Sequence, residues 1–293
     1  MFNLEGIMPP MVTPFTENEK IDEEALIRET QFLVEAGVQG LTVCGSTGEG
    51  YSMTSEEISS VTALVKDEVG SNLPVITGVI ADSANIAIAH GIAARKAGAD
   101  ALMVTPVHYV FKPTDEGNFE YYQRICEVVG LPVMIYNVIP WNAISVDLAV
   151  ELSRIKQIIG IKQSGGDMHG LADMIIALGD RISIMSAIDD MLFPSFLVGA
   201  NGAIACICTI APKLCVDLWE ASESNDIRKC IKIHKRLLTL WRVIGKGDMP
   251  ARAKEALEQI GRHVGPGRGP MIQVSENTKA EIHNALLDTK LIL

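Results

Sequence analysis

The sequence predicts an α/β protein, a TIM-type (β/α)8 barrel with a C-terminal helical extension. Short apolar runs alternate with amphipathic stretches at a spacing of roughly 25 to 35 residues, the rhythm of repeated βα units. Eight such units fit into about 220 residues, whereas a doubly wound sheet more often has fewer strands and a glycine-rich first turn. Beyond Pro212 the pattern is helical only. We therefore expect a barrel over residues 1–223 and a helical region over residues 224–293.

Each apolar run defines one expected strand, in the order 6–12, 39–44, 74–78, 101–105, 132–137, 158–162, 182–186 and 202–206. Between them, Thr54 and Ser145 have the sequence context of helix N-caps. Glycines stand where four of the helices should stop, at Gly37, Gly70, Gly98 and Gly130. The tail is expected to be helical over 214–241, 251–260 and after Ser275, with a Gly- and Pro-rich loop at 261–270.

Composition limits the class of protein. With 48% hydrophobic and 21% charged residues, the 293-residue chain can bury a large core. No apolar stretch reaches the ~18 residues of a membrane span, and the first residues lack signal-peptide features, so we expect a cytoplasmic protein. The net charge of −11, without a Lys/Arg-rich run, argues against nucleic-acid and membrane partners. An anionic substrate would then need local hydrogen-bond donors.

Metal and cofactor motifs are missing from the sequence. The six cysteines form no Cys-x-x-Cys pair, and the six histidines form no His-Glu-x-x-His motif. We also find no dinucleotide-binding or Walker-type glycine loop. We therefore expect neither a metal nor a cofactor.

Lys162 is the first candidate for chemistry. It closes the apolar run 158–161, which reads as a strand buried on both faces. A cation at such a position must be paired or kept neutral, and a neutral lysine can form a Schiff base with a carbonyl substrate. The alternative is a lysine whose amine simply reaches out of the strand end into water.

The other polar residues at predicted strand ends are few. In a (β/α)8 barrel the active site lies at the carboxyl ends of the strands. There, Ser46 and Thr47 stand between two glycines, Gly45 and Gly48, and successive amides with two hydroxyls suit a carboxylate. An ordinary hydroxyl-capped βα turn explains the same pattern.

Tyr136 ends the strand next to that of Lys162, so its phenol should lie close to the amine. A phenol with hydroxyl neighbours can relay protons, which both Schiff-base formation and carbon–carbon cleavage require in a site that excludes water. A tyrosine that is only packed, with its hydroxyl satisfied, is the other interpretation.

These motifs together resemble a known family. Gly45-Ser46-Thr47-Gly48-Glu49, Tyr136-Asn137 and Gly160-Ile161-Lys162, in this order and spacing, are similar to the dihydrodipicolinate synthase and N-acetylneuraminate lyase family of pyruvate-dependent class I aldolases. The likeness extends to Val12-Thr13-Pro14-Phe15 and to the late Gly-Pro-x-Arg-x-Pro at residues 265–270. It covers essentially the whole chain.

The resemblance implies roles for particular residues. Lys162 would form the Schiff base with pyruvate or another 2-oxo acid, Tyr136 would relay protons, and Ser46, Thr47 and Gly48 would hold the pyruvate carboxylate. Thr47 would pass protons to a second tyrosine, which relatives lend across a tight dimer. Tyr109 is the candidate, although His108 could take that position in a segment longer than in the synthases. Ile204, Ser164 and Asp189 are further expected substrate-binding positions. A homodimer or homotetramer is implied.

The departures from the family pattern concern the second substrate, an aldehyde. Synthases resembling this chain carry an arginine shortly after the Tyr-Asn pair for the aldehyde's carboxylate, and residues 138–142 contain none. Ser164 resembles the lyase branch, but that branch's sugar-binding turn is altered to Ala187-Ile188-Asp189-Asp190, and a hydroxyl position becomes Cys206. Trp141 and Ile188 suggest a less polar acceptor pocket.

The sequence therefore predicts a Schiff-base lyase or aldolase with an unassigned acceptor. Alternatives are a 2-oxo sugar-acid dehydratase of the same family and a non-catalytic 2-oxo-acid-binding homologue. A pure binder would have no use for a reactive amine. A metal-dependent aldolase would need a ligand cluster at the strand ends, where only Asp189 and Asp190 stand.

Overall fold

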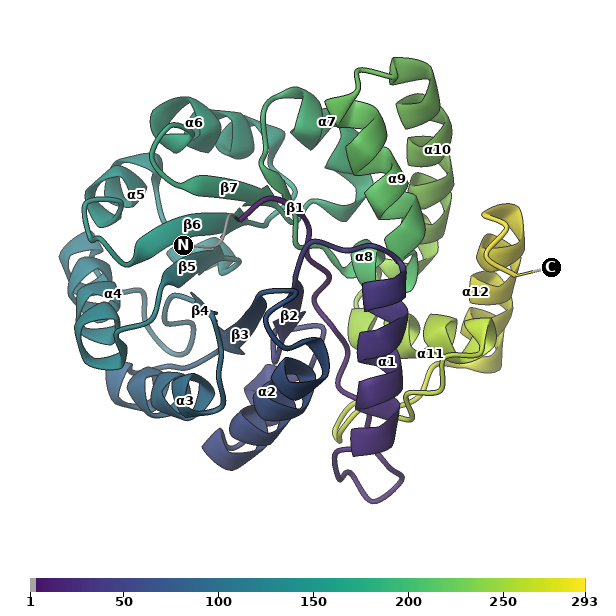
Figure 1. Ribbon diagram of the computed structural model, residues 1–293, viewed down its shortest axis with the longest axis horizontal. Coiled ribbons are helices and arrows are strands. Elements are labelled where there is room, and N and C mark those ends of the chain that lie inside the picture. Colours follow the sequence, from purple (N-terminus) through teal and green to yellow (C-terminus); the bar gives the residue numbers. More distant parts are fainter. Residues whose placement is uncertain (1–3, 293) are drawn as a thin grey trace.

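The computed structural model describes residues 4–292 and confirms the predicted barrel. Eight parallel strands form one curled sheet in the order β1-β8-β7-β6-β5-β4-β3-β2 (Figure 1). A parallel bridge between Pro10 and Thr42 joins the two edges of the sheet. The strands are β1 (Gly6–Ile7), β2 (Leu41–Val43), β3 (Val75–Val79), β4 (Ala101–Val104), β5 (Val133–Asn137), β6 (Ile158–Gln163), β7 (Ser183–Ser186) and β8 (Gly202–Ala203).

The six strands from β2 to β7 agree with the prediction to within two residues, but β1 and β8 are much shorter than predicted. The expected strand 6–12 is interrupted because Pro9 and Pro10 have no amide hydrogen to give to a ladder. The expected strand 202–206 ends early because Cys206 already begins a helix. Cys206 is therefore the first residue of a helix and not the last residue of a strand.

Helices surround the sheet on its outer side (Figure 1). In chain order they are α1 (Glu23–Glu35), α2 (Ser55–Val69), α3 (Ala84–Lys96), α4 (Asp115–Val129), α5 (Val146–Leu152), α6 (Met168–Leu178), α7 (Leu192–Leu197), α8 (Cys206–Ile210), α9 (Pro212–Glu223), α10 (Ile227–Ile244), α11 (Met249–Ile260) and α12 (Glu276–Asp288). Short 3-10 turns follow three strands, at η1 (Gly50–Ser52), η2 (Pro140–Asn142) and η3 (Asp189–Met191).

The helix boundaries follow the predicted capping residues. Thr54 forms a capping box with Glu57, and the Ser145 hydroxyl accepts a hydrogen bond from Leu148. The predicted helical run over 214–241 is wrong in one respect, because it is two helices, α9 and α10. Asn225 between them has a φ of +58°, a left-handed conformation that ends a right-handed helix, and Asp226 then caps α10.

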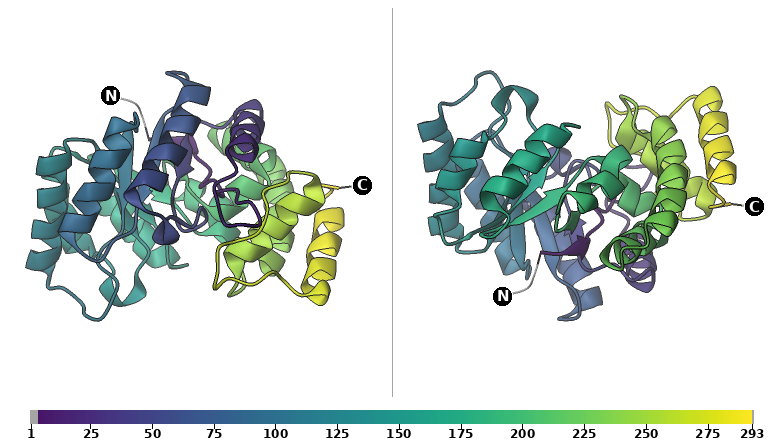
Figure 2. Two further views of the ribbon diagram at one scale, coloured as in Figure 1. Left: turned by 90° about the horizontal axis from the view of Figure 1, so that it is seen from below. Right: turned by 90° about the horizontal axis from the view of Figure 1, so that it is seen from above.

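The C-terminal helices lie together at one side of the barrel (Figure 2). α10 packs against η3, and α11 packs against α8, so the tail covers part of the strands' carboxyl ends. A buried ion pair between Arg262 and Glu29 of α1, with Nε 2.9 Å from Oε1, fastens the end of α11 to the barrel. The division of the chain at residue 223 into barrel and helical region stays a prediction.

Apolar side chains form two separate cores. The larger one fills the space between the sheet and the helices. The smaller one fills the barrel interior with Met8, Met103, Met134 and Met185 beside Leu4, Ile76, Ala101, Tyr136 and Ile204. Among residues 4–292, no helix is both long and apolar enough to cross a membrane.

Candidate active site

Lys162 and Tyr136 face each other at the top of the barrel interior. The two residues are partners in the parallel register of β5 and β6, so their side chains point to the same side of the sheet. The Lys162 amine, Nζ, lies 3.8 Å from the centroid of the Tyr136 ring. Both are buried, with 4% and 5% of their surface exposed. The aromatic face thus attracts an ammonium that has lost most of its water.

The loop after β2 meets this pair. The Tyr136 hydroxyl donates a hydrogen bond of 3.3 Å to Ser46 Oγ. Ser46 belongs to a tight turn in which the Glu49 amide bonds to the Ser46 carbonyl at 3.2 Å. Gly48 is required there, because a Cβ at this position would lie 2.7 Å from the Met11 carbonyl oxygen. The Ser46 hydroxyl is thus bonded to the same tyrosine whose ring faces the Lys162 amine.

A cavity of about 280 Å³ opens onto these groups. Of the predicted site residues, the structure brings six to its wall: Thr47, Tyr136, Lys162, Ser164, Asp189 and Ile204. Ser46 contributes through its bond with Tyr136, whereas Gly48 shapes the loop without lining the cavity. The remaining lining residues are Val138, Ala187, Ala205, Cys206, Trp241, Gly245 and Met249.

Asp189 is the acidic group of the cavity. Its Oδ1 accepts a hydrogen bond of 2.8 Å from the Ile207 amide. Burial raises the pKa of Asp189 to about 7, an effect that the Ile207 amide and the charge of Lys162 oppose. The neighbouring Asp190 turns outward, where its Oδ2 lies 3.6 Å from Arg242. Asp189 is therefore able to be protonated or charged near neutral pH.

Two further groups at the cavity wall are polar or reactive. The Ser164 hydroxyl is shielded from water and has no hydrogen-bond partner among residues 4–292, so it can serve a substrate. Cys206 is fully enclosed, and burial, followed by the nearby Asp189 charge, raises the pKa of its thiol well above the usual range. A neutral thiol at this position has little ability to bind a sugar hydroxyl.

Tyr109 and His108 lie outside the cavity, in the segment between β4 and α4. Asp82 Oδ1 accepts hydrogen bonds of 2.9 Å from the amides of both residues, and His108 Nδ1 is 3.0 Å from the same oxygen. The His108 ring thus lies beside Asp82 and away from the cavity. The Tyr109 side chain is 70% exposed and points away from the core of its own chain.

The predicted apolar contribution of Trp141 and Ile188 is wrong, since neither lines the cavity. Trp141 is on the surface and donates a hydrogen bond to the His108 carbonyl, and Ile188 is part of the larger core. The apolar wall comes instead from Val138, Ile204 and the tail residue Trp241.

Sequence reasoning missed the contribution of the C-terminal tail. Trp241 and Gly245 at the end of α10, with Met249 at the start of α11, close one side of the cavity. The indole lies so close to Gly245 that a Cβ there would be 2.5 Å from Trp241 Cε2. The Trp-x-x-x-Gly spacing places the two residues one helical turn apart, and this was the signal in the sequence that they lie together. The neighbouring sequence does not show that the indole closes a cavity.

Metal-ligating side chains do not gather here. Within the described range, no group of three His, Cys, Asp or Glu residues is arranged to hold a metal ion. Lys162 is the one cationic side chain among the described residues that line the cavity.

A buried lysine at the end of the sixth strand of a (β/α)8 barrel, set against a tyrosine, defines a class I aldolase, an enzyme that works through a Schiff base. Residues 3–289 match the dihydrodipicolinate synthetase family, and the chain belongs to this family.

Relatives with assigned names are similar in sequence to this chain over nearly its full length. A 4-hydroxy-tetrahydrodipicolinate synthase of Methanopyrus kandleri is 33% identical over 289 residues, which cover 97% of this chain and 96% of the relative. One from Bartonella bacilliformis is 32% identical and covers 99% of both chains.

Solved structures have the same fold. A dihydrodipicolinate synthase of Bacillus anthracis superimposes with a TM-score of 0.94 at 29% identity, over 98% of this chain and 99% of that one. YagE, a prophage protein of the same family from E. coli that was solved in complex with pyruvate, gives the same TM-score and identity over 99% of both chains.

We predict that Asp189 makes the folding stability depend on pH. Its pKa in the folded state lies above the usual value of about 3.9, so its stabilising contribution is complete below about pH 4 and is lost as the pH rises through about 7. Relative to Asp189→Asn, the wild type should lose about 1 to 3 kcal/mol of unfolding free energy between pH 4 and pH 8. Urea denaturation at several pH values measures this difference.

Asp190→Asn is the matched control, because Asp190 faces Arg242 near the surface. A difference between wild type and Asp189→Asn that stays constant from pH 4 to pH 8 would show that Asp189 ionises normally in the fold.

Proposed function

We propose that this enzyme forms a Schiff base between Lys162 and pyruvate or another 2-oxo acid, and then makes or breaks a carbon–carbon bond. The observation that carries the proposal is the buried amine of Lys162, 3.8 Å from the Tyr136 ring and open to the cavity. The names and the pyruvate complexes of the relatives support this choice of substrate.

The proposed reaction begins with attack of the neutral amine on the 2-oxo carbon. Loss of water from the resulting carbinolamine gives a protonated Schiff base, which withdraws electrons from the neighbouring carbon. That carbon loses a proton to form an enamine, whose electron pair attacks the carbonyl carbon of an aldehyde. The reverse sequence cleaves the aldol. Tyr136, bonded to Ser46, moves the protons that each step requires.

The carboxylate of the 2-oxo acid would bind at the turn that carries Ser46 and Thr47. Thr47 lines the cavity beside Lys162, and the amides of the turn provide donors of the kind that bind anions. An anionic substrate of a chain whose net charge is −11 requires hydrogen-bond donors close to its binding site, and this turn would provide them.

We propose an aldehyde acceptor that carries no carboxylate. Beyond Lys162, the described part of the cavity wall offers no cation, and Asp189 adds a negative charge whenever it is ionised. A second anionic group would lose its water here without a charged partner. Ser164 and Asp189 instead suit hydroxyl groups, while Trp241, Val138 and Ile204 limit their number.

A 2-oxo sugar-acid dehydratase is the second candidate, and Asp189 is the observation that favours it. With a pKa of about 7, a protonated Asp189 carboxyl can give its proton to a hydroxyl that leaves as water. The electrons for that elimination come from the same enamine on Lys162. The two candidates differ in whether a carbon–carbon or a carbon–oxygen bond breaks.

We further propose that a second copy of the chain covers Tyr109. Tyr109, Val110, Phe111 and Trp141 are large, apolar and mostly exposed, and the Trp141 indole is bonded to the His108 carbonyl. Such a patch marks a protein interface. In a dimer across it, Tyr109 would enter the partner's site as a second proton relay, and the Asp82 carboxylate would hold its backbone in place.

We expect borohydride with pyruvate to add one reduced pyruvyl group, on Lys162 and on no other lysine. Lys162 combines burial, the cavity and a neighbouring aromatic ring. Peptide mass spectrometry of the trapped protein identifies the site, and Lys162→Ala serves as the control. Wild-type protein that stays unmodified, or carries the label elsewhere, would refute the mechanism.

Tyr136→Phe should keep the fold but slow proton transfer by a factor of about 10² to 10⁴, the usual contribution of a positioned acid or base. The ring under Lys162 remains, whereas the bond to Ser46 is lost. The rate at which deuterium from D₂O enters the pyruvate methyl group, followed by NMR, measures this step without an acceptor.

Tyr122→Phe is the matched control for that experiment, because it removes a buried hydroxyl bonded to the Val104 carbonyl, away from the cavity. Equal exchange rates in wild type and Tyr136→Phe would assign the relay to another group or to water.

We expect poor condensation of pyruvate with aspartate semialdehyde. Burying its carboxylate without a charged partner costs about 1.5 to 3 kcal/mol, and about 1.4 kcal/mol is already tenfold. Val138→Arg, at a residue that lines the cavity, should therefore raise this activity at least about tenfold, whereas Trp141→Arg should not, because Trp141 lies on the surface outside the cavity. Asn142 is unsuitable, since it is fully buried and bonded to the Val107 carbonyl. A reductase-coupled assay measures both proteins.

Val138→Gln, which adds a polar side chain at the same place without adding a charge, is the control. A wild-type KM below about a millimolar for this aldehyde, with a rate typical of biosynthetic enzymes, would show that another group supplies the charge.

A further inference from the structure

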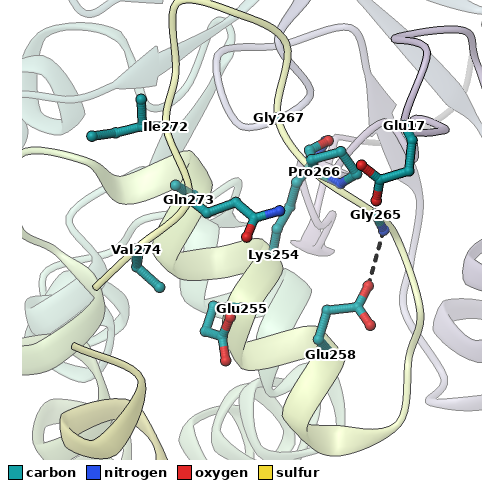
Figure 3. A pocket seen from close by; sticks show the side chains of 11 residues that line it. Glu17, Lys254, Glu255, Glu258, Gly265, Pro266, Gly267, Ile272, Gln273 and Val274 are labelled. Atoms are coloured by element: carbon teal, nitrogen blue, oxygen red, sulfur yellow. Dashed lines mark hydrogen bonds between the residues drawn. The ribbon is translucent and has the colours of Figure 1, made fainter. Parts of the chain in front are cut away.

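Residues 264–270, between α11 and α12, form a segment that we call the C-terminal strap, and it packs against the chain around Phe15. Its Val264 carbonyl accepts a hydrogen bond of 3.1 Å from the Phe15 amide. Gly265, with a φ of +67°, lies so close to Phe15 that a Cβ would be 2.0 Å from the Phe15 carbonyl oxygen. Glu258 of α11 accepts hydrogen bonds from the amides of Val264 and Gly265, the second of which Figure 3 shows. The strap is thus fixed at its beginning.

Glu49, the last residue of the Ser46–Thr47 turn, is a buried carboxylate that the proposed reaction does not use. Its φ is +57°, a left-handed conformation that is unfavourable for a residue with a side chain. Its side chain is fully buried, and Oε2 accepts a hydrogen bond of 2.8 Å from the Arg268 amide of the strap. A charge in this place requires a partner.

Lys254 of α11 supplies that partner. Its Nζ lies 2.8 Å from Glu49 Oε1 and donates a hydrogen bond of 2.8 Å to the Pro266 carbonyl of the strap. The lysine side chain is 3% exposed and reaches up beneath the strap beside a cavity of about 260 Å³ (Figure 3). Two cations lie near the Phe15 ring, whose centroid is 4.4 Å from Lys254 Nζ and 4.3 Å from Arg268 Cζ.

We infer that the Glu49–Lys254 ion pair, with the strap, is a positioning device that holds the Ser46–Thr47 turn in its carboxylate-binding conformation. Glu49 is three residues from Ser46 and closes the turn through its own amide. Pulling its carboxylate towards α11 and the strap therefore fixes where the Ser46 and Thr47 side chains point. This inference rests on the proposed 2-oxo-acid binding for its functional consequence.

Helix α11 connects this device to the other wall of the cavity. Met249 at its first turn lines the cavity, and Lys254 lies five residues later on the same helix. The Arg268 side chain extends the connection to α2, because it forms an ion pair with Glu57 and donates to the Glu19 carbonyl. A displacement of α11 or the strap would reach the turn through Glu49.

The test compares two double variants by two measurements. Lys254→Met with Glu49→Gln removes both charges together, because removing one alone leaves the other buried and unpaired. Lys66→Met with Asp100→Asn is the matched control. That ion pair, at 2.7 Å, also joins a helix to the barrel, but Asp100 bonds to the Val75 amide at the amino end of β3. The measurements are hydrogen exchange of residues 44–53 and the pyruvate concentration that gives half-maximal borohydride trapping.

We expect Lys254→Met with Glu49→Gln to speed exchange in residues 44–53 and to raise the half-maximal pyruvate concentration at least about tenfold, with the same extent of trapping at saturation. The control should change neither. Unchanged exchange in residues 44–53 overturns the inference, as does a half-maximal concentration within about twofold of wild type. If wild type is not trapped at all, the proposed function fails, and the exchange measurement alone still decides whether the ion pair holds the turn.

Discussion

The burial of one amine at the carboxyl end of β6 is the constraint on which the site depends. Removing a cation from water is costly, and a carboxylate in direct contact would hold the amine in its charged, unreactive form. Here the Lys162 amine lies against the face of Tyr136, which attracts a cation more weakly than a carboxylate in direct contact would. The register of β5 and β6 fixes this contact, and that register belongs to a sheet closed by a bridge at Pro10 and Thr42. The geometry of the reactive pair is thus a property of the barrel.

Much of the fold could be predicted because it is encoded locally. The strands from β2 to β7 are continuous apolar runs, and capping residues such as Thr54 mark their helices. The errors in the predicted elements arise where one or two residues interrupt a strand or helix that the hydrophobic pattern predicts. Pro9 and Pro10 shorten β1, and Asn225 divides a helical run. Neither effect changes the hydrophobic periodicity from which the elements were predicted.

The part of the candidate site that lies at strand ends could be predicted from the sequence. Thr47, Tyr136, Lys162 and Asp189 meet because parallel strands bring their carboxyl ends to one rim. Trp241 and Met249 could not be placed, because their position depends on how the tail docks. That docking uses contacts such as Arg262 with Glu29, which are 233 residues apart in the chain. Periodicity within a helix carries no information about a partner so distant.

The cavity has two walls of different origin. The barrel holds the amine, the phenol and the Ser46–Thr47 turn, whereas α10, the residue after it and α11 supply Trp241, Gly245 and Met249 on the other side. On the proposed function, substitutions in the tail would therefore alter which acceptor fits without moving the Lys162 amine. With such a division, the tail helices would determine the range of substrates, and the barrel strands would determine reactivity. Members of one family could in this way exchange acceptors while their first chemical step stays the same.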